Sequence, residues 1–432
     1  MFRPVTCARP LEKRLKKPFP GFFQPRKRKT QFSASIIFDG LKSLKMEKHP
    51  SAARKLSKNR GFQKPIQWTL ATLITWSVTA GAWNLSGDLR VALEKYPDLS
   101  DHSLASRARG RLALDHETKD LALHCEGRFS QAHRPLGSDS RVEMDECYIA
   151  WQGESLGLRI GRQQVAWGRA DGFRLLDRVN PWRIPDLIYD DAADARRSLW
   201  MVLAEGDLNA VQWQAFGGYD RRRDQRSPGF DPFQQDGELP RAVGFGGLHL
   251  ETFVQQLAVG LYWLDQPDLR LPMPGVSDHL RREQALGVSA DLPTGPLVWR
   301  GETMLIRRHE PRNDVTWKPK NRVAALLGID WQPGDWLLSA QLYRYPGPPS
   351  TTYGSLLARW SHFQDRLEIK LFAAHQLAGQ ETWISVQAGF LVGEHLEIRL
   401  EGDWFHAPIE TSGLFGPLSR ATRLGGELVI RF

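Results

Sequence analysis

The chain has 432 residues, a formal net charge of +9 and a sequence pI of about 9.5, values that would suit a nucleic-acid-binding protein. Of its 58 Lys and Arg residues, 18 lie in residues 1–82 beside only three acidic residues, which leaves 40 basic and 46 acidic residues in 83–432. The body of the chain is therefore mildly acidic, and this distribution excludes a nucleic-acid partner held by a basic surface of the body.

A basic stretch, a mostly apolar stretch and a small-residue site follow one another between residues 46 and 82. This order predicts a secretory signal peptide over 46–82, cleaved after Ala80-Gly81-Ala82 so that the mature chain starts at Trp83. A single transmembrane anchor is the alternative, although the apolar stretch is short for one. Residues 1–45 are interpreted as a misassigned start of the reading frame or as a disordered basic N-terminal extension.

Beyond Ala82 no apolar run approaches the length of about 18 residues that a membrane helix needs, so a membrane-spanning body would have to be a β-barrel. Apolar and charged residues alternate instead, most clearly over 394–404. There Ile398 and Leu400 fall on one face of a strand, and Glu401 and Asp403 fall on the other. In a barrel the apolar face meets lipid and the charged face lines water. A soluble, secreted β-rich protein is the alternative.

Taken in order, the pattern predicts about eighteen strands, with sixteen as an alternative if two hairpins are merged. Most odd-numbered connections are long and the even-numbered ones are short, as in bacterial outer-membrane barrels. The predicted fold is therefore all-β: a transmembrane antiparallel β-barrel of 16–18 strands over 83–432, with a long inward-folded loop. The strands are expected near 84–95, 104–116, 119–131, 141–152, 155–166, 197–206, 208–219, 242–253, 255–266, 279–291, 295–308, 320–331, 336–346, 352–364, 365–377, 380–391, 394–406 and 420–432.

The longest irregular connection, residues 168–198, is the main candidate site, because a loop of this length inside a compact domain is usually functional. It carries equal numbers of Arg and Asp, which suit ion pairs to the barrel wall or a charged pore constriction. Both readings, a structural latch and a constriction, stay open. The candidate residues are Arg162, Gln163, Trp167, Arg169, Asp171, Arg174, Asp177, Arg178, Asn180, Arg183, Asp190, Asp191, Asp194, Arg196 and Arg197.

Backbone details of this region follow from its glycines and its strand phase. The phase of the strand sends Arg162 outward, unless Gly161 sits at a β-bulge. Gly168 and Gly172 are expected to adopt backbone conformations that other residues avoid. Three of the loop aspartates, Asp190, Asp191 and Asp194, are interpreted as solvated or paired with Arg196 and Arg197, because they lack the spacing of a calcium loop.

The body contains two cysteines, Cys125 and Cys147, on the third and fourth expected strands. They are symmetrical about the connection at 132–140, which predicts that they are direct cross-strand neighbours. An oxidising periplasm would permit a disulfide between them, and a pair of packed, lipid-facing thiols without a disulfide is the other interpretation; both stay open. No Cys-x-x-Cys-His motif is present, so covalent haem is not expected.

The last strand ends in Phe432, with Ile430 and Leu428 at alternate positions before it. This ending resembles the C-terminal signal that the outer-membrane barrel-assembly machinery reads, although the usual aromatic partners are replaced by Leu and Ile. The sequence has no Gly-x-Ser-x-Gly, His-Glu-x-x-His or P-loop motif, so neither an enzyme, a metal site nor a cofactor is expected.

The segment from Gly161 to Arg183 resembles a family of uncharacterised bacterial outer-membrane β-barrels. Its members share a G-R-Q-x-V-x-W-G-x-A-D-G-x-R pattern, then Asp-x-x-Asn-Pro, then an acidic stretch leading to Arg-x-x-Leu-Trp. The resemblance extends over a span of about forty residues, which ends at Arg197, Leu199 and Trp200. The resemblance implies a porin-like or export channel with no settled substrate and no catalytic residues.

The function expected from these observations is an outer-membrane channel for small hydrophilic or anionic solutes. The alternative is a non-enzymatic scaffold or sheath for a periplasmic or lipid-anchored partner, such as an export or electron-transfer assembly. Expected partners are outer-membrane lipid, lipopolysaccharide and the barrel-assembly machinery, with a homo-oligomer as a further option.

Overall fold

The structure, a computed structural model, describes residues 83–97, 104–134, 137–168, 175–183, 195–222, 238–267, 282–311, 317–345, 351–407, 415 and 422–432. The expected N-terminal extension (1–45) and signal peptide (46–82) lie outside these residues. Among the residues described, no helix is long and apolar enough to cross a membrane.

The described residues form eighteen strands, and each of the eighteen predicted strands is found within a few residues of its expected place. The bounds are β1 Trp83–Lys95, β2 Leu104–Glu117, β3 Leu121–Arg134, β4 Gly137–Gln152, β5 Leu156–Gln163, β6 Leu199–Leu208, β7 Val211–Arg222, β8 Glu238–Val254, β9 Leu257–Pro267, β10 Arg282–Thr294, β11 Leu297–Pro311, β12 Trp317–Trp331, β13 Trp336–Tyr345, β14 Thr351–His362, β15 Leu367–Gln376, β16 Thr382–Val392, β17 Leu396–His406 and β18 Arg423–Arg431.

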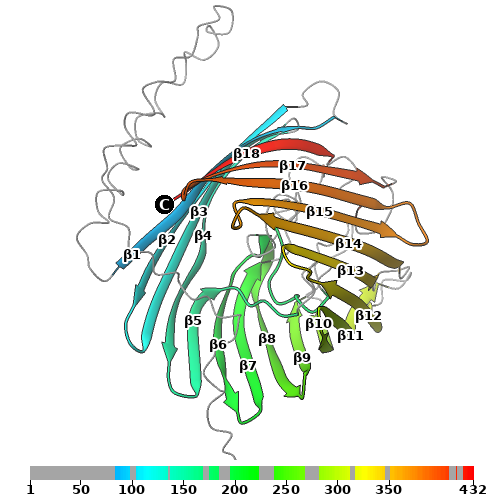
Figure 1. Cartoon of the computed structure of the whole chain (residues 1–432). Coiled ribbons are helices and arrows are strands. Elements are labelled where there is room, and N and C mark those ends of the chain that lie inside the picture. Colours follow the sequence, from blue (N-terminus) through cyan, green and yellow to red (C-terminus); the bar gives the residue numbers. More distant parts are fainter. Residues whose placement is uncertain are drawn as a thin grey trace, which may run out of the picture. The chain divides into compact units, whose positions relative to one another are not determined.

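Each strand pairs in antiparallel fashion with its neighbours in sequence, and β18 pairs with β1, so the sheet closes on itself (Figure 1). The closing ladder runs from Asp88 opposite Arg431 to Lys95 opposite Leu424. It is extended by Phe432, whose backbone N donates to Gly87 O at 3.0 Å and whose O accepts from Gly87 N at 2.9 Å. Closure leaves neither the first nor the last strand as a free edge of the sheet, as a membrane-spanning sheet requires.

Side chains alternate between an apolar outer face and a polar inner face, as predicted. On β17 the side chains of Ile398 and Leu400 are 43% and 63% exposed, whereas Glu401 and Asp403 are 8% and 1% exposed. The same alternation on the other strands sends Leu, Val, Ile and Trp outward. An exposed apolar belt around a charged interior is the arrangement of a transmembrane β-barrel.

The connections differ from the prediction at one place. The expected loop at 132–140 is reduced to residues 135–136, because β3 extends to Arg134 and β4 begins at Gly137. Backbone pairing there continues beyond the apolar belt, where no lipid-facing alternation marks a strand in the sequence. The eight even-numbered connections are the short turns expected, each of two to four residues by the strand bounds.

Candidate functional site

Residues 164–198 connect β5 to β6 and are called the inner loop; its described parts are 164–168, 175–183 and 195–198. The loop packs against inward-facing side chains of the barrel wall, as predicted. The Trp167 ring lies 5.1 Å from the Phe216 ring on β7 and 5.7 Å from the Tyr262 ring on β9. Its indole Nε1 donates to Gln214 Oε1 at 2.8 Å. The loop therefore enters the lumen and crosses from β5 towards β9.

Apolar side chains seat the inner loop. Trp167, Leu176 and Val179 are at most 3% exposed and belong to one buried cluster with Phe216 and Tyr262. Leu176 lies over Gly287 of β10, where an added Cβ would come within 2.5 Å of Leu176 Cδ2. Burial of these side chains stabilises the inner loop against the wall, because apolar surface is removed from water.

Gly168 allows the turn that follows Trp167. Its φ of 81° lies in the region that side chains disfavour, so the prediction for Gly168 is confirmed. A Cβ there would lie 3.1 Å from Glu302 Oε1 and 3.2 Å from Leu176 Cβ. The position thus requires glycine for both conformation and space, whereas Gly172 lies outside the described residues.

Asn180 joins the two ends of the inner loop. Its Oδ1 accepts from the backbone N of Val165 at 2.7 Å, and its Nδ2 donates to the carbonyl oxygen of Arg197 at 2.9 Å. Gln163, fully buried at the end of β5, donates from Nε2 to Met201 O on β6 at 3.2 Å. These buried amides satisfy backbone groups at the mouth of the loop, where the β5–β6 ladder stops.

The returning part of the loop is fixed to the wall by Arg183. Its guanidinium lies 2.9 Å from Glu143 and 2.8 Å from Asp145, both on β4. Asp145 also pairs with Arg128 of β3 at 2.6 Å. Asp145 is the extra residue of a β-bulge, because Glu126 pairs with Glu146 and Gly127 pairs with Met144. The bulge turns two consecutive acidic residues towards the lumen, a frequent use of bulges near functional sites.

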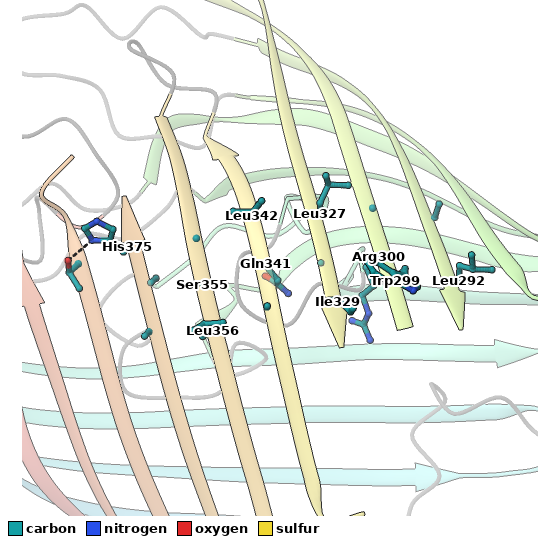
Figure 2. Close-up of a pocket in the computed structure, with 18 of the residues that line it drawn as sticks. Leu292, Trp299, Arg300, Leu327, Ile329, Gln341, Leu342, Ser355, Leu356 and His375 are labelled. Atoms are coloured by element: carbon teal, nitrogen blue, oxygen red, sulfur yellow. Dashed lines mark hydrogen bonds between the residues drawn. The ribbon is translucent and has the colours of Figure 1, made fainter. Parts of the chain in front are cut away.

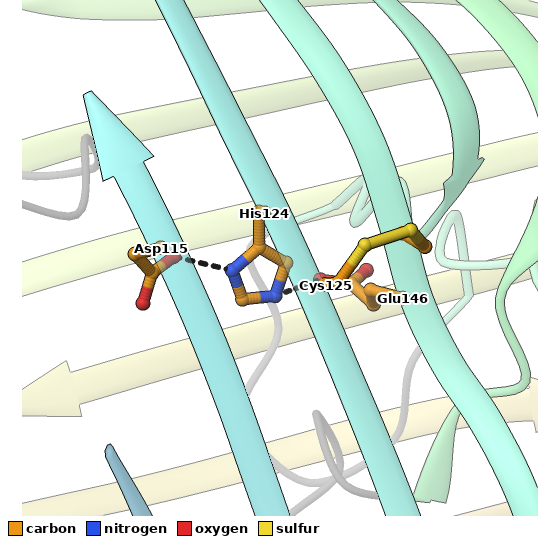
Figure 3. The surroundings of a disulfide bond; sticks show 5 residues. Asp115, His124, Cys125 and Glu146 are labelled. Carbon is orange, nitrogen blue, oxygen red and sulfur yellow. Dashed lines mark hydrogen bonds and ion pairs between the residues drawn. A yellow bond between two sulfur atoms is a disulfide. The ribbon is translucent and has the colours of Figure 1, made fainter. Parts of the chain in front are cut away.

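The second of these acids holds the start of the inner loop. Glu146 Oε1 accepts from the backbone N of Gln164 at 2.7 Å. Its other oxygen lies 3.8 Å from His124 Nε2, and His124 Nδ1 lies 2.7 Å from Asp115 Oδ1 (Figure 3). One bulged strand therefore anchors both the departing and the returning arm of the loop.

The far end of the inner loop is fixed by Arg178, which makes a bidentate ion pair with Glu283 of β10 at 2.7–3.0 Å. The Arg178 carbonyl accepts from Gln266 Nε2 of β9 at 3.0 Å. Glu283 is 1% exposed, so this pair is desolvated on the carboxylate side. Two parallel N–H···O bonds fix orientation as well as distance.

We expect a double-mutant cycle to detect this contact. Arg178→Gln and Glu283→Gln should each destabilise the barrel by about 2 kcal/mol, and the double variant by less than their sum, because each single change leaves a desolvated charge without its partner. Urea unfolding in detergent micelles measures the three values. Additive effects would mean that the two side chains do not interact.

A third ion pair closes the loop on itself. Arg196 binds Asp177, with Nε 3.1 Å from Oδ2, and stacks 5.4 Å from the Trp182 ring. The backbone N of Arg197 donates to Pro181 O at 2.7 Å, next to the isolated bridge between Trp182 and Arg196. The loop is therefore internally tied as well as attached to the wall.

Of the other predicted site residues, Arg162 is 6% exposed and stands opposite Cys147 and Trp200 in an unbroken ladder. The suggested bulge at Gly161 is therefore wrong, and the bulge belongs to β4. Six further candidates lie outside the described residues: Arg169, Asp171, Arg174, Asp190, Asp191 and Asp194.

The two body cysteines are direct cross-strand partners on β3 and β4, with Cα atoms 4.0 Å apart, and the structure joins them in a disulfide (Figure 3). Cys147 immediately follows Glu146, the residue that holds Gln164. The disulfide thus ties β4, which carries the wall anchors Glu143, Asp145 and Glu146, to its neighbour β3.

A second inward contact, which was not predicted from the sequence, involves the connection between β17 and β18. Phe415 is 4% exposed, and its ring lies 5.5 Å from Tyr353 and 5.9 Å from Trp383. Its backbone N donates to Glu381 Oε2 at 3.2 Å, and Tyr353 OH donates to the same oxygen at 2.7 Å. A single Phe between Leu and Gly gives no periodic signal that would have identified it.

The seam where the barrel closes also carries a charged cluster on its inner face. Arg423 of β18 lies 2.9 Å from both Glu401 and Asp403 of β17, and Arg107 of β2 lies 3.2 Å from Glu94 of β1. These side chains are at most 8% exposed. Charges of both signs therefore line the lumen away from the inner loop as well.

The wall residues that bind the inner loop were also not predicted from the sequence. Glu143, Asp145 and Glu283 are separated from their loop arginines by 38 to 105 residues, so no local motif contains both partners. The sequence offered one signal, the alternation of the two faces of a strand. Gln284 and Leu286 face outward near the start of a predicted strand, so Glu283, one residue before Gln284, faces the lumen.

Comparison with solved structures agrees with the fold. OccK5 (OpdH) of Pseudomonas aeruginosa is similar to this chain with a TM-score of 0.51 and 10% identity, over 81% of this chain and 97% of that one. OccAB3 of Acinetobacter baumannii gives 0.49 and 10% over 81% and 99%. A mutant of the Rh. blastica porin gives 0.41 and 12% over 81% and 100%. At 10% identity, the likeness to OccK5 shows the barrel fold alone.

No protein-family model and no curated protein matches the chain. The resemblance of residues 161–200 to a family of uncharacterised barrels therefore stays a prediction.

Proposed function

We propose that the chain is an outer-membrane channel for small hydrophilic or anionic solutes, and that the inner loop forms its constriction. The observation that carries this proposal is the inner loop itself, attached through Arg178 and Arg183 to lumen-facing carboxylates on two parts of the wall. A barrel of this strand number would enclose a wide aqueous lumen without such a loop. Charged groups at a narrowing set which ions pass.

The same contacts make the inner loop a latch as well as a constriction. Its anchors on β4 and β10 lie on either side of the segment that crosses the lumen, so the loop is held at both ends. A loop fixed in this way gives a pore of constant size. The two roles considered for the sequence motif are thereby compatible in one structure.

Conductance of the purified chain in planar bilayers tests the proposal. The unaltered chain should give small, steady single-channel currents, and a variant with residues 170–195 replaced by a short Gly/Ser linker should conduct several times more, because pore cross-section limits current. A variant with residues 224–236, in the β7–β8 connection, replaced by a similar linker is the control. A barrel closed to ions in the unaltered chain and in both variants would favour the sheath or scaffold function.

We also propose that the C-terminal strand carries the signal for barrel assembly. Leu428, Ile430 and Phe432 are 39–49% exposed on the outer face of the barrel. The Phe432 ring lies over Gly87, where an added Cβ would be 2.9 Å from Phe432 Cζ. Deleting Phe432 should lower the amount of folded barrel in the outer membrane, measured by heat-modifiable migration on gels.

A further inference from the structure

A groove of about 840 Å³ lies on the outer surface of the barrel and crosses the strands from β9 to β16 (Figure 2). Its walls are outward-facing apolar side chains, each between 39% and 66% exposed: Leu292, Trp299, Leu327, Leu342, Leu356 and Ile384. Arg300, Gln341 and Ser355, which also border it, alternate with these residues and belong to the inner face. The groove therefore opens towards the membrane.

Small residues make the groove deep. Gly301, Ala340, Gly354 and Ala373 lie among the larger wall residues. The strand register places Gly354 between Leu342 and His375, and places Leu356 between Ala340 and Ala373. A Cβ added at Gly354 would meet only Leu377 Cδ2 at 3.5 Å and Leu342 Cδ2 at 3.9 Å. The floor of the groove at Gly354 is therefore unfilled, and the larger side chains of Leu342 and Leu356 stand beside it.

One end of the groove is polar. His375 and Thr382 both border it, and His375 Nδ1 lies 2.9 Å from Thr382 Oγ1. Arg344, exposed and two residues beyond the wall residue Leu342, stands opposite Thr352. These residues lie near the ends of β13 and β15 and the starts of β14 and β16, on the side of the barrel from which the inner loop departs. That is the extracellular side if the chain is a bacterial outer-membrane barrel.

We infer that the groove binds one acyl chain of a phosphorylated lipid of the outer leaflet, lipid A, with the phosphate at Arg344 and His375. The volume falls within the range of roughly 300–1,000 Å³ found for small-molecule sites. An acyl chain matches an apolar trough of this shape, and a phosphate matches the guanidinium at its polar end. A second copy of the barrel would present a broad wall that cannot enter the trough between the leucine side chains.

The inference rests on the proposed outer-membrane location and is tested without reference to conductance. The full chain is purified in detergent, stripped of lipid and titrated with lipid A, dephosphorylated lipid A or phosphatidylcholine, and bound lipid is counted by native mass spectrometry. Gly354→Phe fills the floor, and Arg344→Gln removes the charge. The matched controls are Gly217→Phe, on the outer face of β7, where an added Cβ would meet only Phe245 O at 3.9 Å, and Arg307→Gln, an exposed residue near the end of β11.

In the titration, the unaltered chain should bind one lipid A molecule. Gly354→Phe should weaken its binding about tenfold or more, as loss of a filled apolar site does. Arg344→Gln should weaken lipid A binding but leave the dephosphorylated form unaffected, and both controls should bind normally. Equal binding by Gly354→Phe and the unaltered chain would overturn the inference. So would a dimer that this substitution dissociates, because the groove would then be a protein interface.

Discussion

Replacing Asp145 with asparagine is expected to destabilise the barrel by about 3 kcal/mol, because it removes the shared carboxylate of two buried arginines. Arg128 and Arg183 lie 2.6 and 2.8 Å from Asp145, and the three residues are 1–8% exposed. An amide cannot compensate two guanidinium charges. The hydrogen bond from the Ser198 hydroxyl to the backbone carbonyl oxygen of Asp145 does not involve the carboxylate, so the change acts through charge alone.

The loss of the Asp145 carboxylate should also change the current through the pore. Arg183 is the wall contact of the returning arm, and without the Asp145 carboxylate it depends on Glu143, which is partly exposed. We therefore expect Asp145→Asn channels to show larger and noisier currents than the unaltered chain. Urea unfolding in micelles and single-channel recording measure the two effects. Glu205→Gln is the control, because its pair with Arg159 at 3.3 Å is partly exposed and should be worth about 1 kcal/mol or less.

An Asp145→Asn protein as stable as Glu205→Gln would show that the cluster on β4 does not anchor the loop. A destabilised protein with normal currents would instead assign Asp145 to barrel stability and leave the inner loop fixed by Arg178 and its apolar contacts.

The strands of this fold could be predicted from the sequence because lipid imposes a strict requirement on every second residue. Ile398, Leu400 and Trp404 must be apolar since they face hydrocarbon, and Glu401 and Asp403 can be charged since they face the lumen. The requirement ends where the strand leaves the membrane. The extension of β3 and β4 around residues 135–136 lies beyond that limit, and it was predicted as loop.

The inner loop was recognisable as a candidate site from its length and charge, but its attachments were not. In a regular strand every second side chain faces the lumen. The single bulge at Asp145 shifts this alternation by one residue, so a different set of β4 side chains faces the lumen after it. Nothing in the local sequence distinguishes a bulge from regular alternation, since Asp145 and Glu146 are both acidic. A bulge was considered only at Gly161, as an exception to the regular phase, and the structure has there a φ of 141° within a continuous ladder.

Gly161→Ala is expected to destabilise the barrel by about 3 kcal/mol, since alanine combines a strained backbone with a collision. The φ of 141° is one that side chains rarely adopt. An added Cβ would overlap the carbonyl oxygen of Cys147 and lie 2.6 Å from Tyr148 Cα. Both obstacles are backbone atoms of β4, so no side-chain rotation relieves them.

We also expect Gly161→Ala to displace the start of the inner loop. Gly161 lies next to Arg162 and two residues before Gln163, whose side-chain amide donates to Met201 O on β6. To admit a Cβ, β5 must move away from β4, and the contact between Glu146 and the Gln164 backbone would lengthen with it. Gly127→Ala is the matched control, since a Cβ at Gly127 meets nothing within 4 Å and Gly127 has no positive φ. Urea unfolding and heat-modifiable gel migration should separate the two variants. Equal stability of Gly161→Ala and Gly127→Ala would mean that β5 can shift without destabilising the barrel. Packing of β5 against β4 would then not require glycine at position 161.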